Sequence, residues 1–438
     1  MTYRLVALAA LLSLAGCDNG MEGPLRPDAG YDAATGYDGA APPGLDGSRP
    51  PPPPGGTTYY EHVRPILSEN CVMCHRPMGV APFALETYEQ AFDVGDRMVD
   101  MTSARIMPPF LADNSGACQT FSNHRGLTDE EIATIATWVD EGKQEGDPTI
   151  PAPDPRVLPS LGSVDITLEM PETYDIMTSI QDDYRCFVVE TGTTADTFVT
   201  GYEVHPGNPQ RVHHVIVYNP ESDAAANQAR NLDAAEGAPG DGYACFGGPR
   251  VGASPMVLWA PGAGATLFPR GTGVPLAAGR AQVVQVHYNN MIDVDATSDR
   301  TTIDLITSPT ASTAYIVPLA HTGIVLPPRM ESVSQSMTQD LSELPIPVRV
   351  HGMFPHMHTL GRQLRVDLSG SSDQCLIDIQ RWDFNWQLAY WFTRPIRVMP
   401  GDAATITCTY NTMERDDTVR WGDGTQDEMC LNYFYVTL

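Results

Sequence analysis

The feature that most constrains the fold is the alternation of short apolar runs and turn residues after Pro155. From there on, short β-branched and aromatic runs alternate with Gly, Pro, Asn and Asp. Clear examples are 212–218, 281–289, 348–353 and 431–438. Short runs between turn residues are typical of antiparallel strands, and no helical periodicity interrupts them. We therefore predict β-sandwich (jelly-roll-like) domains from residue 155 to the C-terminus.

The first seventeen residues are predicted to be an export signal. Arg4 is followed by an apolar stretch that is too short to span a bilayer, and small residues then precede Cys17. The end of this stretch, Leu14-Ala15-Gly16-Cys17, resembles a bacterial lipobox, in which the cysteine becomes an acylated N-terminus. The alternative is a disordered leader with an incidental cysteine. We expect a lipoprotein of the bacterial cell envelope, on the periplasmic or extracellular face, with membrane contact only through Cys17.

Residues 18–57 are rich in Gly, Pro, Ala and Asp, and such a segment cannot bury enough apolar surface to fold. We interpret it as a disordered tether. The whole chain has 26 Lys plus Arg against 54 Asp plus Glu. The resulting net charge of -28 would repel nucleic acid, so we expect no nucleic-acid partner.

Residues 58–150 contain a complete Cys-x-x-Cys-His motif, formed by Cys71, Cys74 and His75. Two thiols at this spacing can form thioethers to the vinyl groups of one porphyrin, while the adjoining imidazole reaches the iron. The alternatives are a zinc knuckle and a redox dithiol. A zinc site would need a second ligand pair at similar spacing, and none appears nearby. The motif therefore predicts one covalently bound haem c.

The second axial ligand of this haem is predicted to be Met107, because the following Pro108 and Pro109 stiffen an extended loop that could present its thioether. The segment resembles the small class I cytochromes c, which have a Met-Pro loop and then a C-terminal helix. The other candidate ligands in the segment are Met73, Met78, Met98, Met101, His62 and His124.

The sequence also predicts the C-terminal helix of this small helical domain. Thr128 and Glu131 have the spacing of a capping box. Ile132, Ile135, Trp138 and Val139 then form an apolar stripe at helical spacing. We assign Trp138 to the core of the domain rather than to an electron path.

Most histidines after residue 155 fall into three clusters: His213-His214, His287 and His356-Met357-His358. In a strand, residues i and i+2 share a face about 7 Å apart, so His356 and His358 can approach one metal. Adjacent histidines cannot do so on a regular strand, and His213-His214 therefore predicts a bulge, a strand end or a strong local twist. The remaining His205, His321 and His351 are predicted to be structural.

The module resembles the copper type II, ascorbate-dependent monooxygenases, the family of peptidylglycine hydroxylase and dopamine β-hydroxylase. The matching segments, in the same order and at fitting separations, are Val212-His213-His214-Val215, Gln285-Val286-His287-Tyr288, His356-Met357-His358 followed by Gly361, and Asp427-Glu428-Met429-Cys430. The resemblance implies two copper domains, at 155–310 and 311–438. An electron-transfer copper would be bound by His213, His214 and His287. The oxygen-activating copper would be bound by His356, His358 and Met429, and would face the first across a solvent cleft.

Coordination chemistry agrees with this assignment. Three imidazoles suit copper or zinc, whereas two imidazoles with the thioether of Met429 favour Cu(I). Within the resemblance, Cys408 with Cys430 and Cys186 with Cys245 are candidate disulfide partners. The pairing of Cys118 and Cys375 stays open.

The substrate site departs from the family pattern at one position. Peptide-amidating members have a carboxylate-binding arginine two residues before the H-x-H pair, and this chain has Phe354 there. Tyr433 matches a substrate-contacting tyrosine of the family. Without the guanidinium the bidentate recognition of a carboxylate is lost, which favours a neutral or aromatic small organic substrate.

We therefore expect a monooxygenase that uses O2 to hydroxylate an activated C–H bond. Its electrons would come at least partly from the fused haem, with ascorbate or another redox donor as the external source. One alternative is a non-enzymatic haem and copper protein for electron transfer or copper handling, which would show no substrate-dependent use of O2. Another is an adhesive β-sandwich lipoprotein with a degenerate metal site, which would contain little copper.

Overall fold

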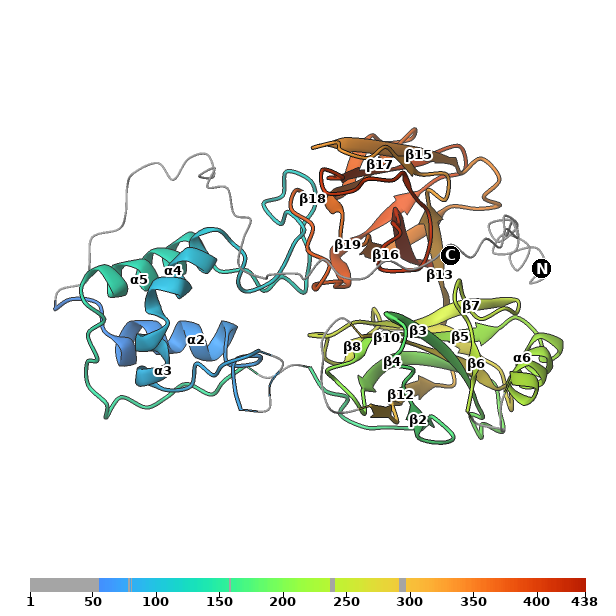
Figure 1. Cartoon of the computed structure of the whole chain (residues 1–438), viewed down its shortest axis with the longest axis horizontal. Helices are drawn as coiled ribbons and strands as arrows, with labels where there is room; N and C mark the ends of the chain where they lie inside the picture. Colours follow the sequence, from blue (N-terminus) through green and yellow to red (C-terminus); the bar gives the residue numbers. More distant parts are fainter. Residues whose placement is uncertain (1–54, 78, 80, 157–158, 237–240, 291–296) are drawn as a thin grey trace.

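The computed structural model describes residues 55–77, 79, 81–156, 159–236, 241–290 and 297–438. Figure 1 shows a small helical domain beside two stacked β-sandwiches. The predicted signal, Cys17, nearly all of the tether and Met78 lie outside the described residues. No helix in the described ranges is long and apolar enough to cross a membrane.

The helical domain packs five short helices around one apolar core. Tyr59, Val63, Ile135 and Trp138 are almost fully buried in it. The helices are the π-helix η1 (Tyr59–Val63), α2 (Arg64–Asn70), α3 (Tyr88–Asp93), α4 (Gly95–Ser103) and α5 (Asp129–Asp140).

The predicted C-terminal helix is α5, and its capping box is confirmed. The Thr128 side chain accepts a hydrogen bond from the Glu131 backbone N–H at 3.2 Å, and the Glu131 carboxylate accepts one from the Thr128 N–H at 2.8 Å. Ile132 and Ile135 are buried on the inner face. Trp138 is also buried, and its Nε1 donates to the Gln144 carbonyl oxygen, so its place in the core is confirmed.

The first sandwich closes two sheets over an apolar core to which both contribute. One sheet has the order β6 (Tyr243–Ala244), β3 (Asp182–Val189), β10 (Gln282–Asn289), β5 (Val212–Pro220) and β7 (Ala253–Trp259). The other has β1 (Ile166–Glu169), β12 (Thr302–Ser308), β4 (Thr197–His205) and β9 (Thr272–Leu276), with β8 (Thr266–Leu267) on β4. Strands β2 (Tyr174–Asp175) and β11 (Ser298–Asp299) form a separate pair.

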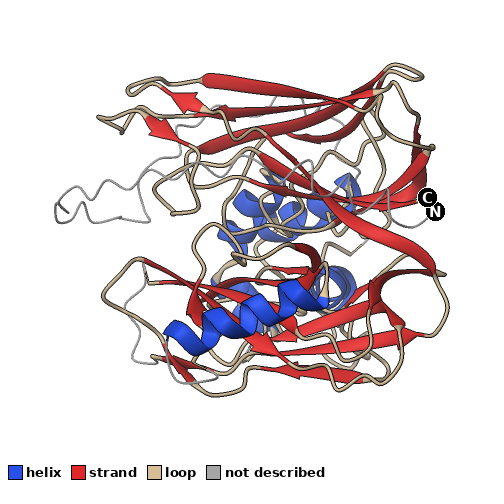
Figure 2. Ribbon diagram, turned by 90° about the vertical axis from the view of Figure 1, so that its right-hand side faces the viewer, coloured by secondary structure: helices blue, strands red, loops and turns tan. Residues whose placement is uncertain are grey.

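The second sandwich is built in the same way, and Figure 2 shows the two stacked one above the other. Its first sheet has the order β13 (Ser312–Ala320), β22 (Leu431–Thr437), β16 (Val348–His356) and β19 (Tyr390–Val398). Its second has β15 (Val333–Asp340), β20 (Ala403–Tyr410), β17 (Gly361–Ser369) and β18 (Gln374–Ile379), and β14 (Val325–Leu326) pairs with β21 (Val419–Arg420). Strand β13 also pairs in parallel with β9, so one sheet runs through both sandwiches. The prediction of β-sandwich domains is confirmed.

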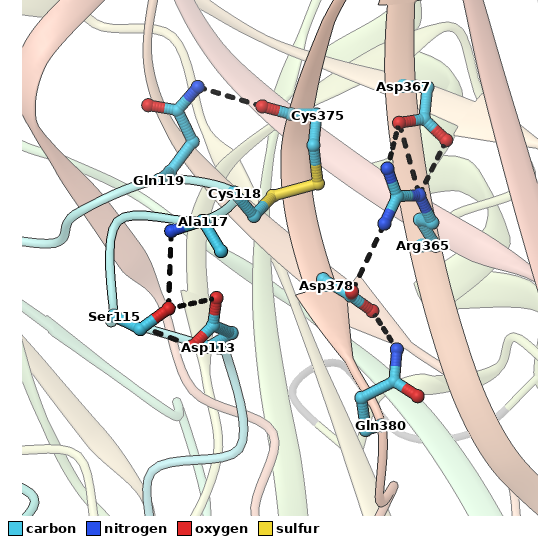
Figure 3. Close-up of a disulfide and its surroundings, with 10 residues drawn as sticks. All are labelled: Asp113, Ser115, Ala117, Cys118, Gln119, Arg365, Asp367, Cys375, Asp378 and Gln380. Carbon is cyan, nitrogen blue, oxygen red and sulfur yellow. Dashed lines mark hydrogen bonds and ion pairs between the residues drawn. A yellow bond between two sulfur atoms is a disulfide. The ribbon is translucent and has the colours of Figure 1, made fainter.

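Three disulfide bonds cross-link the described part of the chain. Cys186–Cys245 lies in the first sandwich and Cys408–Cys430 in the second, as expected. The third bond, Cys118–Cys375, joins the segment that follows the Met-Pro loop to β18 of the second sandwich (Figure 3). Next to it, the Gln119 side-chain amide donates to the Cys375 carbonyl oxygen at 2.8 Å. The helical domain is thus covalently held against the second sandwich.

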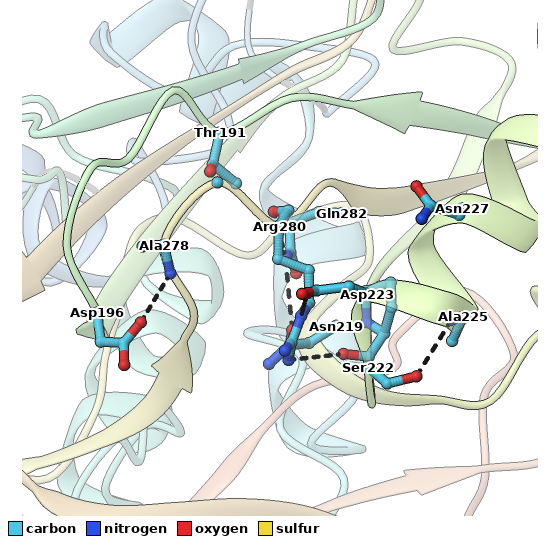
Figure 4. Close-up of polar contacts among 12 residues, drawn as sticks. Thr191, Asp196, Asn219, Ser222, Asp223, Ala225, Asn227, Ala278, Arg280 and Gln282 are labelled. Carbon is cyan, nitrogen blue, oxygen red and sulfur yellow. Dashed lines mark hydrogen bonds and ion pairs between the residues drawn. The ribbon is translucent and has the colours of Figure 1, made fainter.

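One long helix, α6 (Asp223–Glu236), follows β5, where the sequence showed no helical pattern. The Ser222 hydroxyl accepts a hydrogen bond from the Ala225 N–H, and the Arg280 guanidinium binds Asp223 at 3.0 Å (Figure 4). The helix covers the outer face of the sheet through small residues such as Ala229. Alanine has a high helix propensity but is only weakly apolar. An alanine-rich helix therefore has no distinct apolar face that its sequence would reveal.

Candidate metal centres

The first candidate centre lies where β5 pairs with β10. His287 is directly opposite His214, and the register then shifts so that Tyr288 is opposite Val212. His213 is therefore the extra residue of a β-bulge, which turns two adjacent imidazoles toward one point. The expected local irregularity at His213-His214 is present.

The three imidazoles converge through their Nδ1 atoms. Nδ1 of His214 lies 3.3 Å from Nδ1 of His213 and 3.3 Å from Nδ1 of His287. Two nitrogens bound tetrahedrally to one ion, at about 2.0–2.1 Å each, lie about 3.3 Å apart. The spacing therefore fits a single metal ion with three nitrogen ligands.

Burial keeps this centre in the protonation state that a metal requires. It lowers the pKa of His213 to about 4 and holds the pKa values of His214 and His287 well below their ordinary value. Each imidazole is neutral at pH 7, so its lone pair is available to an ion.

A carboxylate and a phenol ring orient His287. Its Nε2 lies 2.9 Å from Asp182 Oδ1, which leaves Nδ1 for a metal. The Tyr184 ring stacks on the imidazole with centroids 4.0 Å apart. Asp182 also accepts hydrogen bonds from the backbone N–H and the hydroxyl of Thr425, so it ties the first sandwich to a loop of the second.

The second candidate centre lies at the end of β16. His356 is the last residue of the strand, His358 follows in the next turn, and their ring centroids are 5.1 Å apart. Nδ1 of His356 lies 2.6 Å from the Gln387 side-chain oxygen, and Nδ1 of His358 lies 3.1 Å from the Asp427 carbonyl oxygen. Both rings thus keep Nε2 for a metal. Burial lowers the pKa of His356 to about 4 and that of His358 to about 3.

Met429 is the predicted third ligand of this centre, and its backbone lies beside that of His358. His356 is opposite Leu431 in the pairing of β16 with β22, and the backbone N–H groups of His358 and Met429 donate to the same oxygen of Glu428. Met429 is buried, with 7% of its surface exposed. A soft thioether beside two imidazoles suits Cu(I).

Glu428 holds this centre together, and the sequence did not single it out. It is fully buried, and Oε2 accepts hydrogen bonds from the backbone N–H groups of His358 (3.0 Å) and Met429 (3.2 Å). Its Oε1 accepts one from the Leu360 N–H at 2.6 Å. The Glu428 carboxyl group therefore fixes the turn of the H-x-H pair against the loop that contains Met429.

The two centres lie next to each other. The rings of His214 and His356 have centroids 6.1 Å apart. The Phe384 ring stacks on His213 at 4.5 Å and lies 6.1 Å from the His358 ring. The centres thus lie near one another, and Phe384 contacts a ligand candidate of each; the solvent cleft between them stays a prediction.

The predicted substrate residues sit on neighbouring strands. Phe354 and Tyr433 are directly opposite each other in the pairing of β16 with β22. Phe354 is buried and packs edge-on against Trp391 with centroids 5.5 Å apart. Burial raises the pKa of Tyr433 to about 12, so its phenol stays neutral. Their contact with a substrate remains a prediction.

In the helical domain the Cys-x-x-Cys-His motif forms a tight turn after α2. The backbone N–H groups of Cys74 and His75 both donate to the Cys71 carbonyl oxygen. Both thiols are free of disulfides. Nδ1 of His75 lies 3.1 Å from the Phe83 carbonyl oxygen, which directs Nε2 away as an iron ligand requires.

A cavity of about 560 Å³ lies between this domain and the second sandwich. Its walls include Met107, His124, Leu127 and Ile132 on one side, and Asp378, Gln380 and Arg381 on the other. Leu127 and Ile132 also belong to the core cluster against which Cys71 packs. Cys71, Cys74 and His75 are not among the residues that line it, so this cavity does not locate the haem that the motif predicts. Of the candidate axial ligands, Met107 and His124 line this cavity, whereas Met73 and Met98 are buried in the domain.

The three histidines expected to be structural have protein partners. Nε2 of His205 lies 3.1 Å from Asp304, and Nε2 of His351 lies 2.9 Å from the Thr437 hydroxyl. Burial and the Gln335 side chain act on the pKa of His321, and burial, which lowers it, is the larger effect.

Sequence reasoning missed Asp182, Phe384, Gln387 and Glu428. Only Glu428 had a local signal, because it lies inside the Asp427-Glu428-Met429-Cys430 segment. The other three reach the centres from strands or loops whose sequences contain no metal-ligand pattern. Their roles follow from tertiary structure alone.

Comparison with known proteins agrees with these centres. The N-terminal domain model of the copper type II ascorbate-dependent monooxygenases matches residues 169–294, and the C-terminal domain model matches residues 311–436. Tyramine beta-hydroxylase of Caenorhabditis briggsae is 24% identical over 66% of this chain and 52% of its own length. Dopamine beta-hydroxylase of Homo sapiens is 24% identical over 71% of this chain and 52% of its own length.

The chain therefore spans about half the length of the curated relatives that it matches. The matched regions contain all six histidine and methionine ligand candidates, and the two domain models lie in the family's order over more than half of the sequence. The chain belongs to the copper type II ascorbate-dependent monooxygenases.

Proposed function

We propose that this protein is a copper-dependent monooxygenase that hydroxylates an activated C–H bond of a small organic substrate with O2. The observation that carries the proposal is the adjacency of two buried, neutral histidine centres with different donor sets. Copper, when bound, would supply the one-electron redox chemistry and the activation of O2. The protein would hold each imidazole neutral, orient it through a hydrogen bond and exclude water.

The proposed substrate is a neutral or aromatic molecule. Phe354 gives the strand an apolar side chain two residues before His356. The relatives named for tyramine and dopamine hydroxylation support an aromatic amine as the first probe. Tyramine should be hydroxylated at the β carbon, whereas a peptide that ends in glycine should not react.

The proposed electron source is a c-type haem in residues 58–150. Support comes from the free thiols of Cys71 and Cys74 and from the orientation of His75. Ascorbate or another external donor would feed the system. The lipobox-like segment before Cys17 supports an envelope lipoprotein, anchored through that cysteine.

The experiment is substrate-dependent O2 consumption by full-length protein matured with haem and loaded with copper. We expect two copper ions per chain and turnover with tyramine that is lost in Met429→Ile. Two bound copper ions without substrate-dependent consumption of O2 would instead support an electron carrier. Little bound copper would support the adhesive alternative.

A further inference from the structure

The second sandwich contains an apolar cavity of about 140 Å³ between its two sheets. Strands β13 and β16 belong to one of these sheets, and β15 and β17 belong to the other (Figure 1). Both sheets contribute to the lining, which includes Val350, Leu368, Leu376, Ala404 and Phe434. Protein interiors are close-packed and contain few voids larger than a water molecule, so a space of this size is unusual for a core.

The cavity has a buried floor and a partly exposed mouth. On the floor, the exposed fractions of Leu368, Leu376 and Ala404 lie between 1% and 4%. At the mouth, Tyr315 on β13 and Leu341 directly after β15 are only partly buried. Among the described strands, β15 pairs with β20 alone, and β13 pairs with β22 alone beyond its first two residues. The cavity therefore opens to the surface between two edge strands of the sandwich.

The lining offers almost no hydrogen-bonding groups. Among the described side chains that line the cavity, only those of Tyr315 and Gln339 carry polar atoms, and both lie on the strands at the mouth. The Gln339 amide donates to the Asp340 carbonyl oxygen at 3.0 Å. A bound water needs about two to four polar partners, and the side chains of the floor supply none. The floor therefore suits a molecule without polar groups.

Ala404 makes room for the cavity. On β20 it is opposite Gln339 of β15 and Leu368 of β17, so a small side chain lies between two longer ones. Side chains alternate between the faces of a strand, and the preceding Ala403 is partly exposed on the outer face. Position 404 thus controls the volume of the cavity, whereas position 403 does not touch it.

The cavity is separate from both metal centres. Val350 lies six residues before His356 on β16, which corresponds to roughly 20 Å along the strand. All six ligand candidates belong to the described part of the chain, and none of them lines the cavity. A molecule bound here would not occupy the place of the substrate or of O2.

We propose that this cavity is a second binding site, which takes a small uncharged hydrocarbon about the size of one aromatic ring. The size follows from an engineered cavity of about 150 Å³ in another protein, which is lined by Leu, Ile and Phe, stays dry and binds benzene. Tyramine is excluded, because its hydroxyl and ammonium groups would be buried without partners. The site thus differs from the proposed substrate site in its chemistry as well as in its position.

The test uses full-length, copper-loaded protein that is kept reduced under argon, with ¹³C-labelled Leu and Val methyl groups. Benzene is titrated into the protein, and the methyl NMR signals are followed. We expect saturable shifts that fit one site per chain and are largest at Val350, Leu368 and Leu376. Phenol should bind more weakly by about fivefold or more, because its hydroxyl group would be buried without a partner.

Three variants examine the position of the site. Ala404→Leu should abolish the saturable shifts, because the added carbon atoms occupy the space above the floor. The matched control Ala403→Leu adds the same atoms on the outer face and should bind benzene like the wild type. Leu376→Ala enlarges the cavity and should bind naphthalene, which the wild type excludes. This third variant tests the site even if Ala404→Leu does not fold.

Three results would overturn the proposal. The first is benzene binding by folded Ala404→Leu with the affinity of the wild type. The second is a set of wild-type shifts that do not saturate, or that spread over the surface rather than the cavity. The third is folded Leu376→Ala that does not bind naphthalene.

Discussion

Replacing Glu428 with glutamine should weaken the methionine-containing copper centre far more than it weakens the fold. The Glu428 carboxyl group accepts backbone hydrogen bonds from His358, Leu360 and Met429. A glutamine side chain can accept through only one of its two end atoms, so the variant leaves at least one buried N–H without a partner. That loss costs about 1–3 kcal/mol of unfolding free energy.

Glu428→Gln should also lower the copper affinity of the methionine-containing centre, and by a larger relative amount than it lowers the unfolding free energy. Glu428 sets the distance between the turn of His358 and the loop of Met429, and loss of such an outer contact typically lowers metal affinity about 10–100-fold. Cu(I) affinity, measured by competition with a chromophoric chelator, should fall by this factor at one centre. The centre of His213, His214 and His287 should keep its affinity, because its support comes from Asp182.

The control is Asp402→Asn in the second sandwich. Asp402 is equally buried and accepts hydrogen bonds from the backbone N–H groups of Met399 and Ser371. This variant should lose a similar unfolding free energy in denaturant and keep both copper affinities. The reasoning is refuted if Glu428→Gln is destabilised as much as the control and still binds Cu(I) like the wild type.

Ionisation of Glu428 adds a pH dependence with a definite sign. Burial raises its pKa to about 8 from an ordinary value of 4.5, against the opposing effect of the backbone N–H groups of His358, Leu360, Met429 and Gly361. The folded protein thus keeps a proton that the unfolded chain releases, so stability falls as the pH rises from about 4.5 to 8. Unfolding free energies across this range should fall more steeply in the wild type than in Glu428→Gln.

Three further predictions concern other parts of the chain. Met429→Ile should weaken one copper centre and abolish oxygenation while the three-histidine centre stays filled; zinc at both centres, or full activity, would contradict the assignment. Cys71→Ala combined with Cys74→Ala should abolish covalent haem, measured by mass after denaturation, and haem that stays attached would disprove the motif's role. In copper-free protein, the ring NMR signals of His356 and His358 should titrate with midpoints near 4 and 3. Since the unfolded chain takes up these protons near pH 6.5, the two histidines reduce stability as the pH falls from about 6.5 toward 4; midpoints near 6.5 would show that the rings are not buried.

The ligand candidates could be predicted from the sequence because strand geometry links sequence spacing to position in space. Adjacent His213 and His214 required an irregular strand, and the bulge opposite His287 supplies it. Residues 128–140 could be predicted as a helix because a capping box is followed directly by apolar residues at helical spacing. In both cases a local sequence pattern is enough to predict the structure.

The contacts around the centres could not be predicted in this way. Asp182 and Gln387 reach their histidines across 105 and 31 residues of sequence. The partners of the Cys118–Cys375 disulfide are 257 residues apart, in different domains. Helix α6 escaped detection because alanine gives no apolar stripe. These features depend on how sheets and domains pack, which a single sequence does not encode locally.

The most direct test of the central claim is isotope incorporation from ¹⁸O₂. Full-length protein with haem and copper would be supplied with a reductant, tyramine and ¹⁸O₂, and the product analysed by mass spectrometry. The account predicts one ¹⁸O atom in a product hydroxylated at the β carbon, with none formed by Met429→Ile. Oxygen derived from water, or no product from protein that contains both copper ions and shows turnover of its redox centres, would contradict a monooxygenase.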